Sequence, residues 1–99
     1  MPGANLNNIT APDQYTERAV VRAPGARHLF ISVSNQAIYY QVGHGPGGGG
    51  VTWDEEEVFR LPSLYNIDVA CDAVRIRAAV PAADLPAPLQ PAQVTVSLS

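Results

Sequence analysis

The sequence predicts an all-β protein: a single antiparallel β-sandwich or jelly-roll-like domain that carries an extended N-terminal arm. Three observations lead to this prediction. Apolar residues recur with a period of two from residue 16 onward, turn-forming residues interrupt that pattern at roughly ten-residue spacing, and no segment has the period of an amphipathic helix. Since the chain has 99 residues, one domain accounts for it.

The first residues differ in character from the rest of the chain. Residues 1–14 are polar and contain Asn5, Asn7 and Asn8 as well as two prolines. They have too little apolar content to form a core of their own. We therefore divide the chain into an extended arm, residues 1–14, and a β-sandwich domain, residues 15–99, and we expect the arm to be ordered mainly by a partner.

The first half of the domain is predicted to form a short strand and a hairpin. Residues 16–22 make the strand, which ends at the turn Ala23-Pro24-Gly25. Residues 27–34 and 37–42 flank the tight turn Asn35-Gln36 and are predicted to pair as a β-hairpin. Its inward positions are Leu29, Ile31, Val33, Ile38, Tyr40 and Val42.

The second half is predicted to contain a glycine-rich loop and four more strands. Residues 43–50 form the loop, because glycine and proline disfavour regular structure. Strands are predicted over residues 51–61, 65–71, 73–79 and 93–98, with an extended proline-rich connection over residues 80–91. The inward positions of the last two strands are Val74, Ile76, Ala78, Val94, Val96 and Leu98.

Composition excludes several classes of protein. The net charge is −3 and the chain contains six arginines and no lysine, so nucleic-acid binding through a basic surface is not expected. No apolar run approaches the ~18 residues of a membrane-spanning helix. Residues 1–5 have neither a basic start nor an apolar stretch, so no signal peptide is expected.

No motif for catalysis, a metal or a cofactor is present in the sequence. The glycine loop lacks the lysine of a phosphate-binding loop, and His28 and His44 do not have metal-ligand spacing. Cys71 closes an apolar alternation that begins with Tyr65, Ile67 and Val69 and that places Tyr65 inward. Cys71 itself is interpreted as a small buried hydrophobic residue. We expect a protein that is not an enzyme and that binds no cofactor, metal, membrane or small-molecule substrate.

The acidic run Asp54-Glu55-Glu56-Glu57 has three interpretations. It forms a solvated strand edge, it contacts a basic partner, or it coordinates Ca²⁺, although neighbouring strand residues point to opposite faces and do not converge on one ion. The aromatic residues also leave alternatives open. Phe30 and Tyr39 either form an exposed interface patch or pack on a second sheet, and Trp53 is the best candidate for a carbohydrate platform.

The order of several segments resembles small virion structural proteins of tailed bacteriophages. The segments are LFISVSNQAIYYQVGHG, VTWDEEEVFRLP, DAVRIRAA and PAQVTVSL, which span Leu29 to Leu98. The resemblance implies a non-enzymatic capsid decoration or minor capsid protein that is assembled in the host cytoplasm and binds the major capsid protein. A sugar- or receptor-binding β-module of a phage tail or fibre is the alternative.

The resemblance implies that the protein binds the major capsid protein and also other copies of itself. We expect a homo-oligomer, with a cyclic trimer as the specific prediction, because repeated contacts with a lattice increase avidity. The exposed loops, the arm and the acidic edge supply the candidate contacts. The candidate partner-binding residues are Asn5, Asn7, Asn8, Phe30, Tyr39, His44, Asp54, Glu55 and Glu56.

Overall fold

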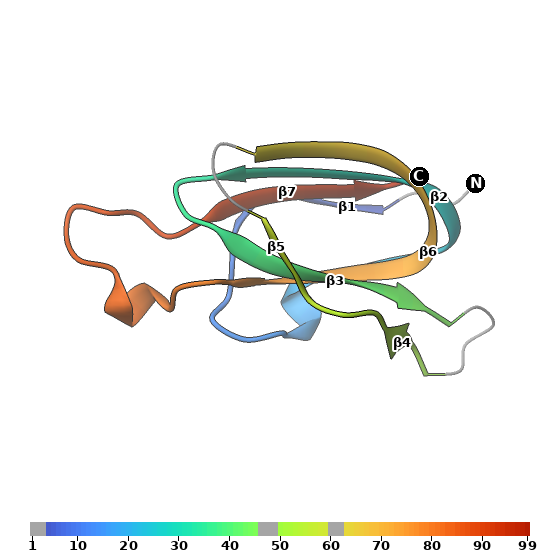
Figure 1. Ribbon diagram of the computed structural model, residues 1–99, viewed down its shortest axis with the longest axis horizontal. Coiled ribbons are helices and arrows are strands. Elements are labelled where there is room, and N and C mark those ends of the chain that lie inside the picture. The colour runs from blue at the N-terminus through green and yellow to red at the C-terminus, as the bar shows by residue number, and fades with distance from the viewer. Residues whose placement is uncertain (1–3, 46–49, 60–62) are drawn as a thin grey trace.

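The computed structural model is all-β, as the sequence predicts, and its strands form one antiparallel sheet of seven strands (Figure 1). The structure describes residues 4–45, 50–59 and 63–99. The elements in chain order are β1 (Ala4–Thr10), η1 (Glu17–Ala19), β2 (Val20–Ser34), β3 (Ile38–His44), β4 (Thr52–Trp53), β5 (Glu57–Phe59), β6 (Ser63–Ala78), η3 (Ala82–Asp84) and β7 (Gln93–Leu98).

Two long strands, β2 and β6, fold the sheet into two facing layers. Both bend in their middle, so each contributes its two halves to different layers (Figure 1). The first layer has the order β1-β7-β2-β6 and uses residues 63–71 of β6. The second layer contains residues 73–78 of β6, then β3, with β4 and β5 paired to β3. This is how strands turn the corners of a sandwich.

The bends are held by a bulge and by one carboxylate. The β2–β6 register shifts between Arg22 and Ala26, where Gly25 has a φ of 78°, a conformation that favours glycine. Asp72, at the bend of β6, accepts the backbone N–H of Gly25 at 2.9 Å through Oδ1 and that of Gly45 at 2.8 Å through Oδ2. Asp72 thereby ties the bends of β2 and β6 to the end of β3.

Two predicted strand breaks are wrong, because both lie inside continuous strands. The segment Ala23-Pro24-Gly25 forms the bulge of β2 rather than a turn, and β2 begins at Val20 after the short helix η1 instead of at residue 16. Asp72 does not end a strand either, since β6 runs through it from Ser63 to Ala78. Residues that form turns also form bulges, which the sequence pattern does not distinguish.

The predicted hairpin between residues 27–34 and 37–42 is also wrong. Asn35 has a φ of 77° and the chain does turn there, but β2 and β3 do not pair with each other. The second half of β2 already has β6 on one side and β7 on the other. The chain therefore crosses to the other layer, where β3 pairs with residues 73–78 of β6.

Residues 4–10 of the predicted arm lie in the sheet as β1. They pair antiparallel with β7, and Leu6 and Ile9 pack against the core. Ala11 is 5% exposed, and the Pro12 carbonyl accepts the N–H of Ala78 at 2.7 Å. Residues 4–10 pair with their own chain, and the register shift between Leu6 and Ile9 lets both of these side chains face the core.

The predicted loop and acidic strand have different bounds in the structure. Gly43 and His44 belong to β3 rather than to the loop, and residues 46–49 lie outside the described part. The predicted strand over residues 51–61 is divided into β4 and β5, and residues 54–56 between them are not in a strand. Four adjacent acidic residues disfavour a continuous ladder because strands place like charges close together.

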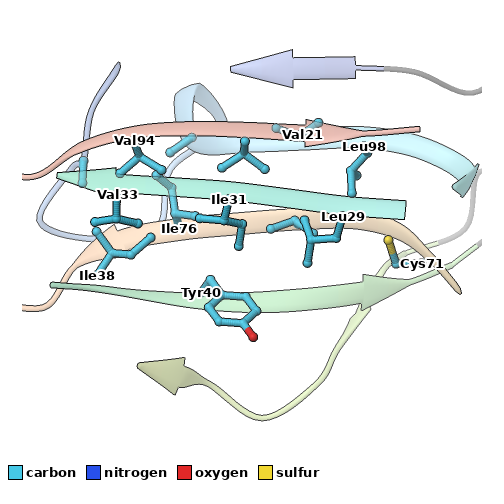
Figure 2. Packing of buried hydrophobic residues seen from close by; sticks show 14 of the residues in the cluster. Val21, Leu29, Ile31, Val33, Ile38, Tyr40, Cys71, Ile76, Val94 and Leu98 are labelled. Atoms are coloured by element: carbon cyan, nitrogen blue, oxygen red, sulfur yellow. The ribbon is translucent and has the colours of Figure 1, made fainter. Parts of the chain in front are cut away.

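The predicted core is confirmed. Leu29 and Ile31 on β2 and Ile38 on β3 are fully buried and belong to the cluster of apolar side chains between the strands (Figure 2). Val42 and Tyr65 are exceptions among the predicted inward residues, since both are only half-buried, as are Ile67 and Val69 of the same alternation. The described residues include no buried polar or charged side chain. The two layers are therefore held together by apolar contacts.

Candidate functional site

An apolar groove with an acidic rim lies between β3 and the first half of β6. It has a volume of about 280 Å³. Its floor consists of half-buried or buried apolar and aromatic residues, and three carboxylates form its rim. The floor residues are Tyr40 and Val42 from β3 with Tyr65, Ile67 and Val69 from β6, and the rim residues are Asp54, Glu55 and Glu57.

The groove runs beside an unpaired strand edge. Residues 63–71 of β6 pair with β2 on one side, whereas β3 pairs only with residues 73–78. Within the described residues no strand pairs with the other side of residues 63–71, so alternate backbone N–H and C=O groups there lack a ladder partner. Leu64 at the start of this edge is 68% exposed. An apolar floor beside an open edge is the arrangement that binds extended peptides.

The acidic run divides between two surfaces. Glu57 is paired with Tyr40 in the β3–β5 register, so it lies on the groove side, together with Asp54 and Glu55. Glu56 instead binds Arg77, with its two oxygens 2.8 Å and 3.0 Å from the guanidinium nitrogens. The hydrogen bonds with Arg77 and then Tyr15 lower the pKa of Glu56.

Two tyrosines meet across the layers at the groove. The rings of Tyr40 and Tyr65 have centroids 6.2 Å apart and are tilted by 50°. Burial and the nearby Tyr65 raise the pKa of Tyr40 to about 12. The Tyr40 hydroxyl is therefore neutral at physiological pH, and Asp54, Glu55 and Glu57 on the rim give the groove its negative charge.

A second surface, on the outer face of β3 and β6, is a stack of arginines and aromatic rings. The Arg75 guanidinium carbon is 4.3 Å from the ring centroid of Tyr15 and 4.2 Å from that of Trp53. Arg77 lies 4.4 Å from the ring of Tyr39. These are cation–π distances, so the aromatic rings hold both arginines in place. Trp53 contacts Arg75 with one face, and that face is not available to a sugar.

Tyr15 joins this stack from the segment before η1. Its hydroxyl donates to Glu56 Oε2 at 2.5 Å. Burial, and then the hydrogen bond to Glu56, raise the pKa of Tyr15 above its usual range. A neutral hydroxyl can donate this hydrogen bond, whereas a phenolate cannot.

The predicted partner-binding residues do not form one surface. His44 Nε2 lies 2.9 Å from Asp54 Oδ2, so His44 contacts a rim residue of the groove without lining the groove itself. The three asparagines, Asn5, Asn7 and Asn8, are exposed on β1, at the edge of the first layer opposite β6. Glu56 belongs to the arginine stack.

Phe30 and Tyr39 are not neighbours, so they do not form the predicted patch. Phe30 on β2 pairs with Asn66 and Ser97 in the first layer. Tyr39 on β3 pairs with Arg77 and Val58 in the second layer. The two positions would be adjacent only if β2 and β3 paired, which they do not.

His28 and Cys71 lie outside the groove and the arginine stack. His28 Nδ1 lies 2.8 Å from Asp68 Oδ1, and this hydrogen bond raises the pKa of His28. Cys71 is buried, as predicted, and burial raises the pKa of its thiol. Across residues 4–45, 50–59 and 63–99, no three His, Cys, Asp or Glu side chains are placed to hold a metal ion together.

The floor of the groove and the position of Glu57 on its rim were not predicted from the sequence. The apolar alternation over residues 65–71 predicts inward side chains, but Tyr65, Ile67 and Val69 are only half-buried. Period-two alternation marks which residues point inward, but it does not show whether a second layer covers them. The arginine stack had a signal in the sequence, because two strands each place polar or aromatic residues at alternate positions. These are Tyr39 and Gln41 on one strand and Arg75 and Arg77 on the other, and the two sets pair in the sheet.

The chain was compared with protein families, curated proteins and solved structures. No protein-family profile, no curated protein and no solved structure matches this chain. A search of the described ranges for a membrane-crossing helix found none of sufficient length and apolar character.

Proposed function

We propose that this chain is a non-enzymatic virion structural protein of the capsid decoration or minor capsid type, which docks on the head lattice of a tailed bacteriophage. The resemblance of its ordered segments to such proteins supports the class. One structural observation supports the mode of docking: the acid-rimmed groove with an apolar floor lies beside an edge of β6 that no strand in residues 4–45, 50–59 or 63–99 pairs with. The proposed partner is the major capsid protein.

The chemistry of the groove defines the partner's docking segment. An unpaired edge accepts an extended strand through backbone hydrogen bonds, and the floor accepts every second side chain of that strand. Asp54, Glu55 and Glu57 on the rim favour a segment that also carries Lys or Arg. The proposed occupant is therefore an extended segment in which apolar and basic residues alternate.

A second copy of this chain fits the groove less well than such a segment. Two β6 edges paired by a two-fold axis would bring their two acidic rims together. Like charges brought together across an interface oppose association. Homo-oligomerisation, for which a cyclic trimer is our proposal, would then use another surface and present several grooves to the lattice.

Occupancy of virus particles tests the proposal. Purified particles of the virus that encodes this sequence are mixed with tagged protein and sedimented, and bound protein is measured by densitometry. We expect saturable binding that weakens as the salt concentration rises, since the rim charges are exposed and therefore screened. The triple variant Asp54→Asn, Glu55→Gln, Glu57→Gln should bind at least about tenfold more weakly, as expected when charge complementarity is lost.

A matched variant separates the groove from general charge effects. Asp84→Asn removes an exposed carboxylate in η3, outside the groove, and should bind like wild type. Equal binding of the triple variant and wild type would contradict docking through the groove. Absence of binding by wild-type protein to the particles, together with its absence from virions by mass spectrometry, would contradict the virion function itself.

A further inference from the structure

Arg75 differs from the other arginine of its stack in having no carboxylate of its own. Arg77 forms a two-oxygen ion pair with Glu56. Arg75 donates Nε–H to Gln41 Oε1 at 2.8 Å, but among the described residues it forms no ion pair, and its effect on Glu56 is only a weaker, longer-range one. An arginine carries five N–H donors, so four of them remain after the bond to Gln41.

The position of these remaining donors is restricted by the rings. Tyr15 and Trp53 each lie within 4.3 Å of the guanidinium carbon, measured to the ring centroid. Because the guanidinium is planar, rings that stack on it leave its edge as the part that can accept a new ligand. A guanidinium edge with paired N–H groups matches the two oxygens of a carboxylate.

Arg75 lines a cavity of about 400 Å³. The cavity also contains Val20 and Val51, which provide apolar contact, and Arg22, which Glu17 neutralises with oxygens 3.0 Å and 3.1 Å from Arg22 Nη2. The charge of the lining therefore sums to a single positive charge, that of Arg75. A ligand with one negative charge is matched by Arg75, whereas the second charge of a phosphate dianion would have no cation of its own and would be repelled by Glu17.

We infer that the cavity beside Arg75 is a binding site for a monocarboxylate that carries a small apolar group. The carboxylate binds the free edge of the Arg75 guanidinium, and the apolar group lies toward Val20 and Val51. The same chemistry is available from a free organic acid, from the terminal carboxylate of a protein, or from an acidic side chain. This site is on the outer face of the second layer, and its occupancy does not depend on the groove or on the proposed virion function.

Trp53 reports on the site, because it is the only tryptophan of the chain and stacks on Arg75. Its fluorescence is recorded while the full chain is titrated with three carboxylates and their neutral amides. The pairs are butyrate with butyramide, N-acetylvaline with N-acetylvalinamide, and N-acetylglutamic acid α-amide with N-acetylglutamine amide. We expect at least one carboxylate to saturate the signal and to bind at least about tenfold more tightly than its amide. The member that binds best identifies the source of the ligand.

Two variants locate the binding. Arg75→Lys keeps the charge but removes the two-pronged edge, so it should weaken binding at least about tenfold. The matched control Arg27→Lys changes an exposed arginine outside this cavity and should bind like wild type. Should Arg75→Lys not fold, Thr16→Phe narrows the cavity at an exposed position of its lining and should also abolish saturation.

Three results would overturn the inference. The first is the absence of saturable change with all three carboxylates in folded wild-type protein. The second is equal binding of a carboxylate and its amide. The third is undiminished binding in folded Arg75→Lys or Thr16→Phe, since the ligand would then lie elsewhere.

Discussion

Single side chains hold the bends of this fold, and Asp72 is the clearest case. Its two oxygens accept N–H groups from Gly25 and Gly45, which lie far apart in the sequence. Those two hydrogen bonds lower the pKa of Asp72, with the bond from Gly45 the larger cause. The charged carboxylate is therefore part of the folded structure rather than an incidental surface group.

The lowered pKa of Asp72 predicts a dependence of stability on pH. The folded pKa lies below the unfolded value of about 3.9, so the stabilisation is fully present above that pH and is lost as the pH falls through the folded pKa. Asp72→Asn should lower the melting temperature at pH 7, because an amide has one acceptor oxygen and presents N–H groups to the other donor. Thermal melts between pH 7 and pH 2 should show a smaller loss on acidification for Asp72→Asn than for wild type.

The control for this prediction is Asp84→Asn, which changes an exposed carboxylate in η3. Its melts should follow those of wild type at every pH. Identical acid sensitivity of Asp72→Asn and wild type would show that Asp72 does not hold the bends.

A second residue-scale prediction concerns Gly43, which lies in β3 opposite Trp53. A Cβ added there would stand 2.4 Å from Val51 Cγ1 and 2.8 Å from the Trp53 ring. Gly43→Ala should therefore cost about 1–3 kcal/mol of stability, as overpacking generally does, and should shift the Trp53 emission. Gly50→Ala, which meets no atom within 4 Å, is the control and should do neither. Equal melting temperatures for the two variants would contradict the placement of Trp53 over Gly43.

At the scale of elements, β1 is the part whose role differs most from the sequence prediction. Leu6 and Ile9 are half-buried against the core, and the whole strand covers the edge of β7. Removal of residues 1–10 should cost about 2 kcal/mol, estimated from two half-buried aliphatic side chains. It should also expose the β7 edge and so promote self-association.

Urea unfolding and light scattering of the truncated protein check this prediction. The expected result is a lower unfolding midpoint and a larger scattering mass at high protein concentration. Unchanged values in both measurements would mean that β1 contributes nothing to the sheet, as expected for an arm that only a partner orders.

Local pattern predicted the inward face of each strand but not the pairing between strands. Alternation placed Leu29, Ile31 and Val96 correctly, because side-chain direction depends only on the strand itself. It failed at residues 23–25 and at Asp72, since a bulge or bend uses the same residues as a turn. It failed again at Asn35, where long-range pairing of β2 with β6 and β7 prevents a local hairpin.

The candidate site was predictable only in part for the same reason. The acidic run is visible in the sequence, and it does reach the groove through Asp54 and Glu55. The floor of the groove depends on the separation of the two layers beside Tyr65 and Ile67, which follows from the bend of β6 and from an edge that no described strand covers. A sequence pattern carries no information about that separation.

At the scale of the whole molecule, the bends of β2 and β6 produce both the core and the groove. The second half of β6 pairs with β3, whereas no strand among the described residues pairs with the same edge of its first half. The molecule measures 44 × 23 × 21 Å, so the long axis offers an extended surface to a partner (Figure 1). The central claim is that this edge and the acidic rim are where the partner binds.

Hydrogen–deuterium exchange of the protein, free and bound to purified virus particles, tests this claim most directly. Docking through the groove predicts slower exchange on binding at alternate amides of residues 64–70 and over residues 54–57, because a partner strand would accept hydrogen bonds from the β6 edge. Exchange in the exposed residues of β1 should stay unchanged, which serves as the internal control. Protection confined to β1 or to the face around Trp53, with residues 64–70 exchanging as in the free protein, would contradict the claim.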